Sequence, residues 1–173
     1  MLKNLPVCTH IAAIVPLYTK AGDTTAIITT DGTSTSTATS VRTVLRRLAH
    51  SRSADLTALR HHTTLATGRR ILHPLPLAPG LVLCPVKTRI PKVTGDTSTG
   101  YINYHAVTGV AETALSSYQA IVKLAGGTDI ANFGAAEPRF RFVESHLSGE
   151  TEPRCWVESH PSGQPPQLSL VNR

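Results

Sequence analysis

Cysteine is scarce in this chain of 173 residues, which contains only Cys8, Cys84 and Cys155. The set is odd in number and widely spaced, and no CxxC pair occurs. A disulfide framework is therefore not indicated, and free thiols are typical of a reducing compartment. We expect a cytoplasmic protein.

Short motifs for cofactors and metals are also missing. The sequence has no Walker phosphate loop, no GxGxxG, no HExxH and no paired-carboxylate motif. Its eight histidines give no convincing zinc spacing, either at His61-His62 or where Cys155 precedes His160. We therefore expect no cofactor, no metal and no catalysis.

Long apolar runs are absent as well. The N-terminal segment 1–20 carries one early lysine, and its apolar residues are interrupted by Pro6, His10 and Pro16. Such a run is too short for a membrane span and lacks the pattern of a secretory signal. We expect neither secretion nor a membrane partner.

Acidic residues are few where basic residues are most frequent. The chain has 17 Lys and Arg against 11 Asp and Glu, a net charge of +6, and residues 40–92 hold ten of the cations but one acid, Asp55. Such an excess suits a phosphate polymer, because each neutralised phosphate releases counterions. A solvated basic surface without a dedicated partner is the simpler alternative.

Two helices are predicted within residues 41–67. Ser40 is a candidate N-cap, and the residues after it place an apolar side chain at the i, i+3, i+4 and i+7 positions of one helical face: Val41, Val44, Leu45 and Leu48. In the second helix Ser53 can serve as the N-cap, with Asp55 in the first turn and Gly68 at the end.

The centre of the chain predicts two strands around a short basic loop. Residues 81–86 form an apolar run, Gly95-Asp96 marks a turn, and residues 101–107 resume an apolar and aromatic pattern. The preceding residues 73–80 contain three prolines and a glycine, which predicts an extended connector.

Further hairpins are predicted on both sides of this centre. Residues 11–18 and 24–30 form the first, and the Thr/Ser run at 33–40 is either a polar sheet edge or a loop. After a loop around 109–117, residues 118–133 form another hairpin with a glycine turn, which we expect to extend the same sheet.

These segments together predict an α+β domain over residues 1–147. Its sheet is mostly antiparallel and carries a two-helix insert. Prolines interrupt the pattern after Gly134, and residues 148–173 are polar, which predicts a disordered C-terminal tail.

Several of the segments resemble the ComK family of competence transcription factors. Leu81-Val-Leu-Cys-Pro85 is similar to an apolar strand of the family, Lys87-Thr-Arg89 to its basic loop, and Tyr101-Ile-Asn-Tyr-His105-Ala-Val107 to its Trp-Ile strand. Val122-Lys-Leu-Ala-Gly-Gly-Thr128 is similar to a later strand and glycine turn. The resemblance covers roughly residues 9–135, with Tyr101 at the family's Trp position and prolines where the family has a further helix.

The resemblance implies a DNA-binding transcriptional regulator of competence that contacts AT-rich duplex DNA, chiefly in the minor groove. It also implies a homo-oligomer at the nucleoid and RNA polymerase as a partner. Narrow A-tract minor grooves attract Lys and Arg because their negative potential is enhanced. The expected contacts are the loop cations Lys87, Arg89 and Lys92, with Asn103 and His105 sharing one face of the following strand. Flanking phosphates are assigned to the other cations: Arg42, Arg46, Arg47, Arg69 and Arg70.

Three alternatives stay open at this point. Residues 41–67 also suit a helix-turn-helix that reads the major groove with Thr57, Arg60, His61 and His62. Cys84 with His105 as its base suits a thiol-dependent enzyme, although a cysteine in an apolar run is more often inert core. A structural interaction domain that uses the sheet edge is the third.

Overall fold

The computed structural model describes residues 6–20, 22–68, 71–112, 120–132, 139–144 and 153–158. The chain divides into two units, Met1–Phe133 and Gly134–Arg173. The first unit contains the strands and helices expected of an α+β domain, and its strands pair antiparallel throughout. The predicted fold class is therefore confirmed.

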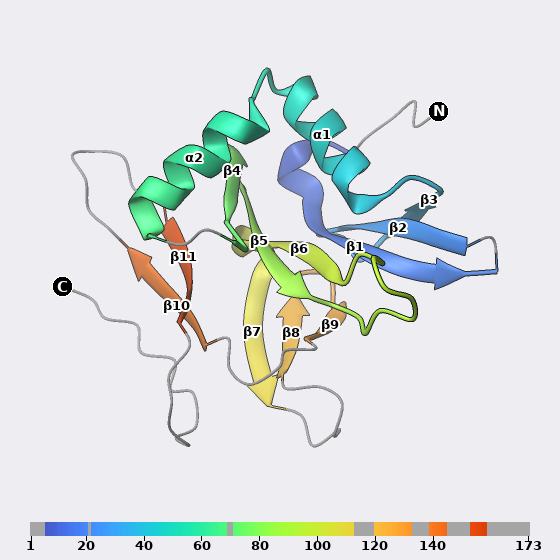
Figure 1. The fold of residues 1–173 in the computed structure, drawn as a ribbon. Helices are drawn as coiled ribbons and strands as arrows, with labels where there is room; N and C mark the ends of the chain where they lie inside the picture. The colour runs from blue at the N-terminus through green and yellow to red at the C-terminus, as the bar shows by residue number, and fades with distance from the viewer. Residues whose placement is uncertain are drawn as a thin grey trace. The chain divides into compact units, whose positions relative to one another are not determined.

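A six-stranded antiparallel sheet forms the centre of the first unit (Figure 1). Its strand order is β3-β2-β1-β6-β5-β4, so strands that are far apart in sequence meet at the β1–β6 pair. The strands are β1 (Ile11–Thr19), β2 (Gly22–Thr29), β3 (Ser34–Thr37), β4 (Leu75–Ala78), β5 (Leu81–Lys87) and β6 (Thr99–Asn103). The predicted hairpin at the start of the chain is β1 with β2, and the Thr/Ser run supplies the edge strand β3.

The segment expected to be an extended connector is instead the other edge of this sheet. Within β4, Leu75 and Leu77 are buried whereas Pro76 is half-buried, which is the alternation of a strand with one face on the core. Pro76 is tolerated because an edge strand needs no hydrogen bond on its outer side.

A separate three-stranded sheet follows, made of β7 (Val107–Glu112), β8 (Ala120–Leu124) and β9 (Asp129–Asn132). The late hairpin was predicted correctly, but it does not extend the first sheet. The expected strand 101–107 ends at Asn103, because a 3-10 turn, η2 (Tyr104–Ala106), redirects the chain before β7 begins. The expected loop around 109–117 is likewise replaced by β7 as far as Glu112.

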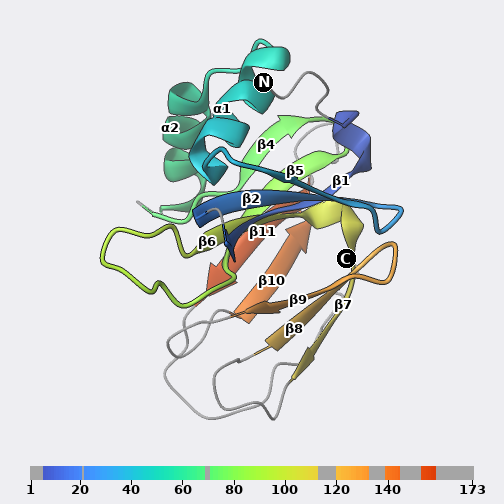
Figure 2. The ribbon, with the colours of Figure 1, turned by 90° about the vertical axis from the view of Figure 1, so that its right-hand side faces the viewer.

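Two helices, α1 (Val41–Ser51) and α2 (Leu56–Thr67), are inserted between β3 and β4. Both lie on the same face of the six-stranded sheet in Figures 1 and 2. Ser40 caps α1 by accepting a hydrogen bond from the Thr43 amide, as predicted. Gly68 ends α2 in the left-handed conformation with φ of 68°, which favours glycine.

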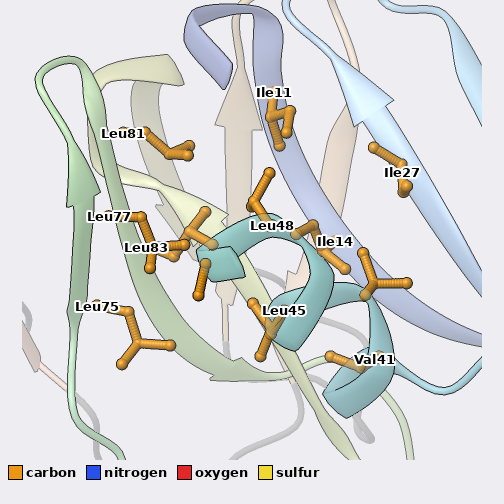
Figure 3. Packing of buried hydrophobic residues seen from close by; sticks show 12 residues of the cluster. Ile11, Ile14, Ile27, Val41, Leu45, Leu48, Leu75, Leu77, Leu81 and Leu83 are labelled. Carbon is orange, nitrogen blue, oxygen red and sulfur yellow. The ribbon is translucent and has the colours of Figure 1, made fainter. Parts of the chain in front are cut away.

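The core lies between α1 and the sheet (Figure 3). Val41, Leu45 and Leu48 of α1 point toward β1, β2, β4 and β5. Full burial of each large aliphatic side chain contributes about 1.5–3 kcal/mol of transfer free energy. The sheet contributes the other half of the cluster: Ile11, Ile14, Ile27, Leu75, Leu77, Leu81 and Leu83.

The second helix begins at a different cap from the one expected. The Asp55 carboxylate accepts hydrogen bonds from the amides of Thr57, at 2.7 Å, and Ala58, at 3.4 Å. Ser53 instead occupies the turn between the helices with a φ of 52°. Asp55 is the N-cap because Arg52 and Ser53 still belong to the turn that ends α1, where their amides donate to the carbonyls of Ala49 and His50.

We expect Asp55→Ala to lower the free energy of unfolding by about 1 kcal/mol, since two amides at the start of α2 lose their acceptor. Ser53→Ala is the matched control, because Ser53 caps neither helix, and should stay within about 0.5 kcal/mol of the parent. Urea unfolding followed by circular dichroism measures both. Equal losses would mean that Asp55 is not the cap.

The described residues of the second unit form an antiparallel hairpin, β10 (Arg139–Glu144) with β11 (Pro153–Glu158). Arg139 pairs with Glu158 at one end, and Glu144 pairs with Pro153 at the other. We expected residues 148–173 to form a disordered tail. Pro153–Glu158 within that range is a strand, and the rest of the range lies outside the described residues.

Candidate nucleic-acid interface

Arg89, which we expected to be displayed on the basic loop, is buried. Only 8% of the residue is exposed, and its Nη1 lies 2.6 Å from Oδ1 of Asp23 at the start of β2. Its Nε donates to the carbonyl of Thr97 at 2.6 Å. Neither Nη1 nor Nη2 has a hydrogen-bond partner in the described part of the chain. The contact with Asp23 is therefore an ion pair without the N–H alignment of a hydrogen bond. The prediction that the loop displays Arg89 is therefore wrong.

Tyr18, at the end of β1, organises the rest of the 88–98 loop. Its ring lies under two cations, 4.0 Å from the Arg89 guanidinium carbon and 4.7 Å from Lys92 Nζ. Its hydroxyl donates to the Asp96 carboxylate and accepts from the Lys92 amide at 2.8 Å. These contacts join the loop to β1 and leave Lys87 and Lys92 exposed.

The pKa values of this pair shift in opposite directions. The pKa of Tyr18 is raised, first by its partial burial and then by its hydrogen bond to Asp96. The Tyr18 hydroxyl in turn lowers the pKa of the Asp96 carboxyl below its ordinary value. Both shifts favour a neutral phenol that donates to an ionised carboxylate near neutral pH.

Asn103 and His105 do not share a face, contrary to the prediction. Asn103 is 1% exposed, donates to the carbonyls of Ile11 and Gly80, and accepts from the Val82 amide. His105 lies exposed in η2, beyond the end of β6. The alternation that we assumed fails because the strand stops at Asn103, whose side chain also accepts from the His105 amide.

The helix arginines lie where the sequence predicted them. Arg42, Arg46 and Arg47 are all exposed on α1, opposite its buried stripe. Arg69 and Arg70 lie outside the described residues. Arg42, Arg46 and His50 follow one another at intervals of four residues and therefore form one row along the helix.

This row forms one wall of a groove of about 310 Å³ between α1 and the start of α2, which we call the α1–α2 groove. Thr57 and Arg60 line it from α2, together with the cap carboxylate of Asp55. From the sequence we assigned Arg42 and Arg46 to flanking phosphates and predicted no groove. His50 was missed, although the same interval reaches it, and we assigned Arg60 only to a helix-turn-helix.

Arg60 lies near Tyr101 of β6. Burial raises the pKa of Tyr101, and the nearby charge of Arg60 acts in the opposite direction. Tyr101 packs against the core cluster, as expected. Arg60 also lines the groove, so one cation of α2 shares it with those of α1.

The residues proposed for thiol chemistry lie in unlike environments. Cys84 is 4% exposed in the middle of β5, opposite Ile102, whereas His105 is exposed. Among the described residues there is no cluster of three or more histidine, cysteine, aspartate or glutamate side chains that could hold a metal ion.

No helix in the described ranges combines the length and the apolar character that a membrane span requires. Comparisons of the chain with family models, with curated proteins and with solved structures give no match.

Proposed function

We propose that this chain is a DNA-binding regulator of transcription whose helices α1 and α2 face the phosphate backbone of duplex DNA. The supporting observation is the charge of this layer. It carries five arginines against one acid, Asp55, whose carboxylate is engaged by backbone amides. The arginines are Arg42, Arg46, Arg47, Arg52 and Arg60.

Such a layer supplies affinity rather than sequence specificity. Cations that neutralise phosphates release counterions, so binding falls steeply as salt rises. Contacts to phosphate fix the position of a protein on the duplex, whereas sequence is read from base edges or from groove shape. In this proposal Lys87 and Lys92, which remain exposed, are the cations available to a groove.

The resemblance to the ComK family supports the regulatory part of the proposal and a preference for AT-rich duplex in the cytoplasm. Because Arg89 is buried, we assign it a different role from the one that the resemblance implies. Arg89 positions the 88–98 loop, and the helical layer takes the main share of the phosphate contacts.

The test is fluorescence anisotropy with AT-rich and GC-rich duplexes at several salt concentrations. We expect the double variant Arg42→Ala, Arg46→Ala to bind at least tenfold more weakly, because two charge-assisted contacts are lost. The slope of log affinity against log salt should fall by about 1.8, that is, roughly 0.9 for each phosphate contact. Alanine is a good helix former, so α1 should be retained.

Lys123→Ala is the control. Lys123 is an exposed cation on β8, whose sheet lies on the opposite side of the six-stranded sheet from the helices (Figures 1 and 2). It should bind duplex like the parent. Equal losses in the two variants, or an unchanged salt slope in the double variant, would remove the helical layer from the interface.

A further inference from the structure

We propose that the α1–α2 groove is a binding site for a multiply charged phosphate group, such as a phosphomonoester or a pyrophosphate. The choice of phosphate rests on the proposed function, and the site deepens it. The internal phosphates of a duplex carry one charge each. A terminal phosphate or a free polyphosphate carries more.

The charges around the groove set this preference. Three arginines, Arg42, Arg46 and Arg60, and one acidic residue, Asp55, line the groove, which leaves an excess of two positive charges. A phosphomonoester carries about −1.5 to −2 at neutral pH and matches that excess. His50 adds a ring nitrogen donor to the same wall.

The chemistry of the donors also suits phosphate. A guanidinium presents a planar fork of N–H groups that can bind two oxygens of one phosphate at once. Here such forks come from two helices that line the groove, with Arg42 and Arg46 on α1 and Arg60 on α2. An anion in the groove can therefore bind arginines of both helices.

The size of the groove leaves room for the ligand. Besides Thr57, its remaining lining comes from the small or apolar residues Ala49, Ala54 and Leu56. Its volume of about 310 Å³ is at the lower end of the range for small-molecule sites. A phosphate with part of its ester group therefore fits, whereas a duplex can enter only with an end or one edge.

The backbone of both walls is in place before a ligand arrives. The α1 wall is attached to the core through Val44, Leu45 and Leu48, which are nearly fully buried. At the start of α2, the Asp55 cap fixes the first turn. A site that is already arranged loses less conformational entropy on binding than one that must form.

The test is isothermal titration calorimetry of the full chain with sodium pyrophosphate at constant ionic strength. We expect one site per chain, weakened about tenfold or more by Arg46→Ala, since one charge-assisted contact is lost. Arg47→Ala removes another exposed arginine of α1 that does not line the groove, and it should change the affinity less than twofold. Equal losses would show a diffuse charge effect and overturn the site.

A second variant should strengthen binding. Asp55→Asn removes the only carboxylate of the groove while asparagine still caps the helix. We expect roughly two- to fivefold tighter pyrophosphate binding, the size of a partly exposed charge interaction. Because this variant gains affinity, misfolding cannot imitate the result, and weaker binding would contradict the proposal.

A further arm identifies the source of the phosphate. A duplex with 5′-phosphate ends is compared with the same duplex carrying 5′-hydroxyl ends. Tighter binding of the phosphorylated duplex, lost in Arg46→Ala, assigns the groove to nucleic-acid ends, whereas equal binding with competition by pyrophosphate assigns it to a free phosphate ligand.

The two proposals fail separately. If pyrophosphate gives no binding heat and no competition while the duplex still binds through Arg42 and Arg46, the groove site is overturned and DNA binding stands. If pyrophosphate binds through Arg46 but no duplex binds, the groove stands and the DNA proposal falls.

Discussion

Replacing Gly126 by alanine is expected to lower the free energy of unfolding by about 3 kcal/mol or more. Gly126 lies in the turn between β8 and β9 with φ of +85°. A Cβ atom there would lie 2.4 Å from the Gly32 nitrogen and 2.7 Å from the Thr30 carbonyl oxygen. Both are backbone atoms, so no side chain can rotate away, and the two turns would have to separate.

The turn that Gly126 meets is itself held firmly. The Thr29 hydroxyl and the Thr33 amide both donate to the Asp31 carboxylate. These bonds, that of Thr29 first, lower the pKa of Asp31 to about 2. The carboxylate therefore stays ionised at any ordinary pH. Moving the β2–β3 turn away from the added methyl group should cost free energy, because these hydrogen bonds would be strained.

Gly127→Ala separates the steric cost from the backbone cost. Gly127 also has a positive φ, +74°, but a Cβ there would meet no atom within 4 Å. Its replacement should cost about 1–2 kcal/mol, the usual penalty of a left-handed conformation for alanine. Denaturant unfolding at constant m-value measures both variants. Equal costs would show that the β2–β3 and β8–β9 turns do not touch.

The second large effect is expected at Asn103, which should lose about 3–5 kcal/mol of stability when replaced by alanine. Its amide nitrogen donates to the Ile11 carbonyl at 2.9 Å and to the Gly80 carbonyl at 3.0 Å. Its oxygen accepts from the Val82 amide at 3.2 Å. Alanine would remove these hydrogen bonds from the Ile11 and Gly80 carbonyls and the Val82 amide, and each buried group left unsatisfied costs about 1–3 kcal/mol.

His105→Ala is the matched control, because His105 was assigned to the same DNA-contacting face but lies exposed in η2. It should change stability by less than about 0.5 kcal/mol. Asn103→Asp keeps the oxygen but loses the two donated hydrogen bonds, so it should also destabilise strongly. Thermal unfolding by calorimetry compares the three. A stable Asn103→Ala variant with weakened duplex binding would restore the original assignment.

The apolar face of α1, its Ser40 cap, the first hairpin and the glycine turn before β9 were all predictable from sequence. Each of these features depends on residues that are close together in the sequence. Secondary-structure propensity and the spacing of apolar residues therefore decide it. The basic centre was equally visible, since charge composition needs no fold.

Only the tertiary structure decided what the individual polar residues do. Arg89 is buried because β1 and β2 bring Tyr18 and Asp23 to it from the start of the chain. Asn103 became internal because β6 lies between β1 and β5, and Arg60 joined Arg42 and Arg46 because the turn after α1 brings the start of α2 to the same groove. These outcomes depend on contacts between distant segments, and a linear pattern of residue types does not carry that information.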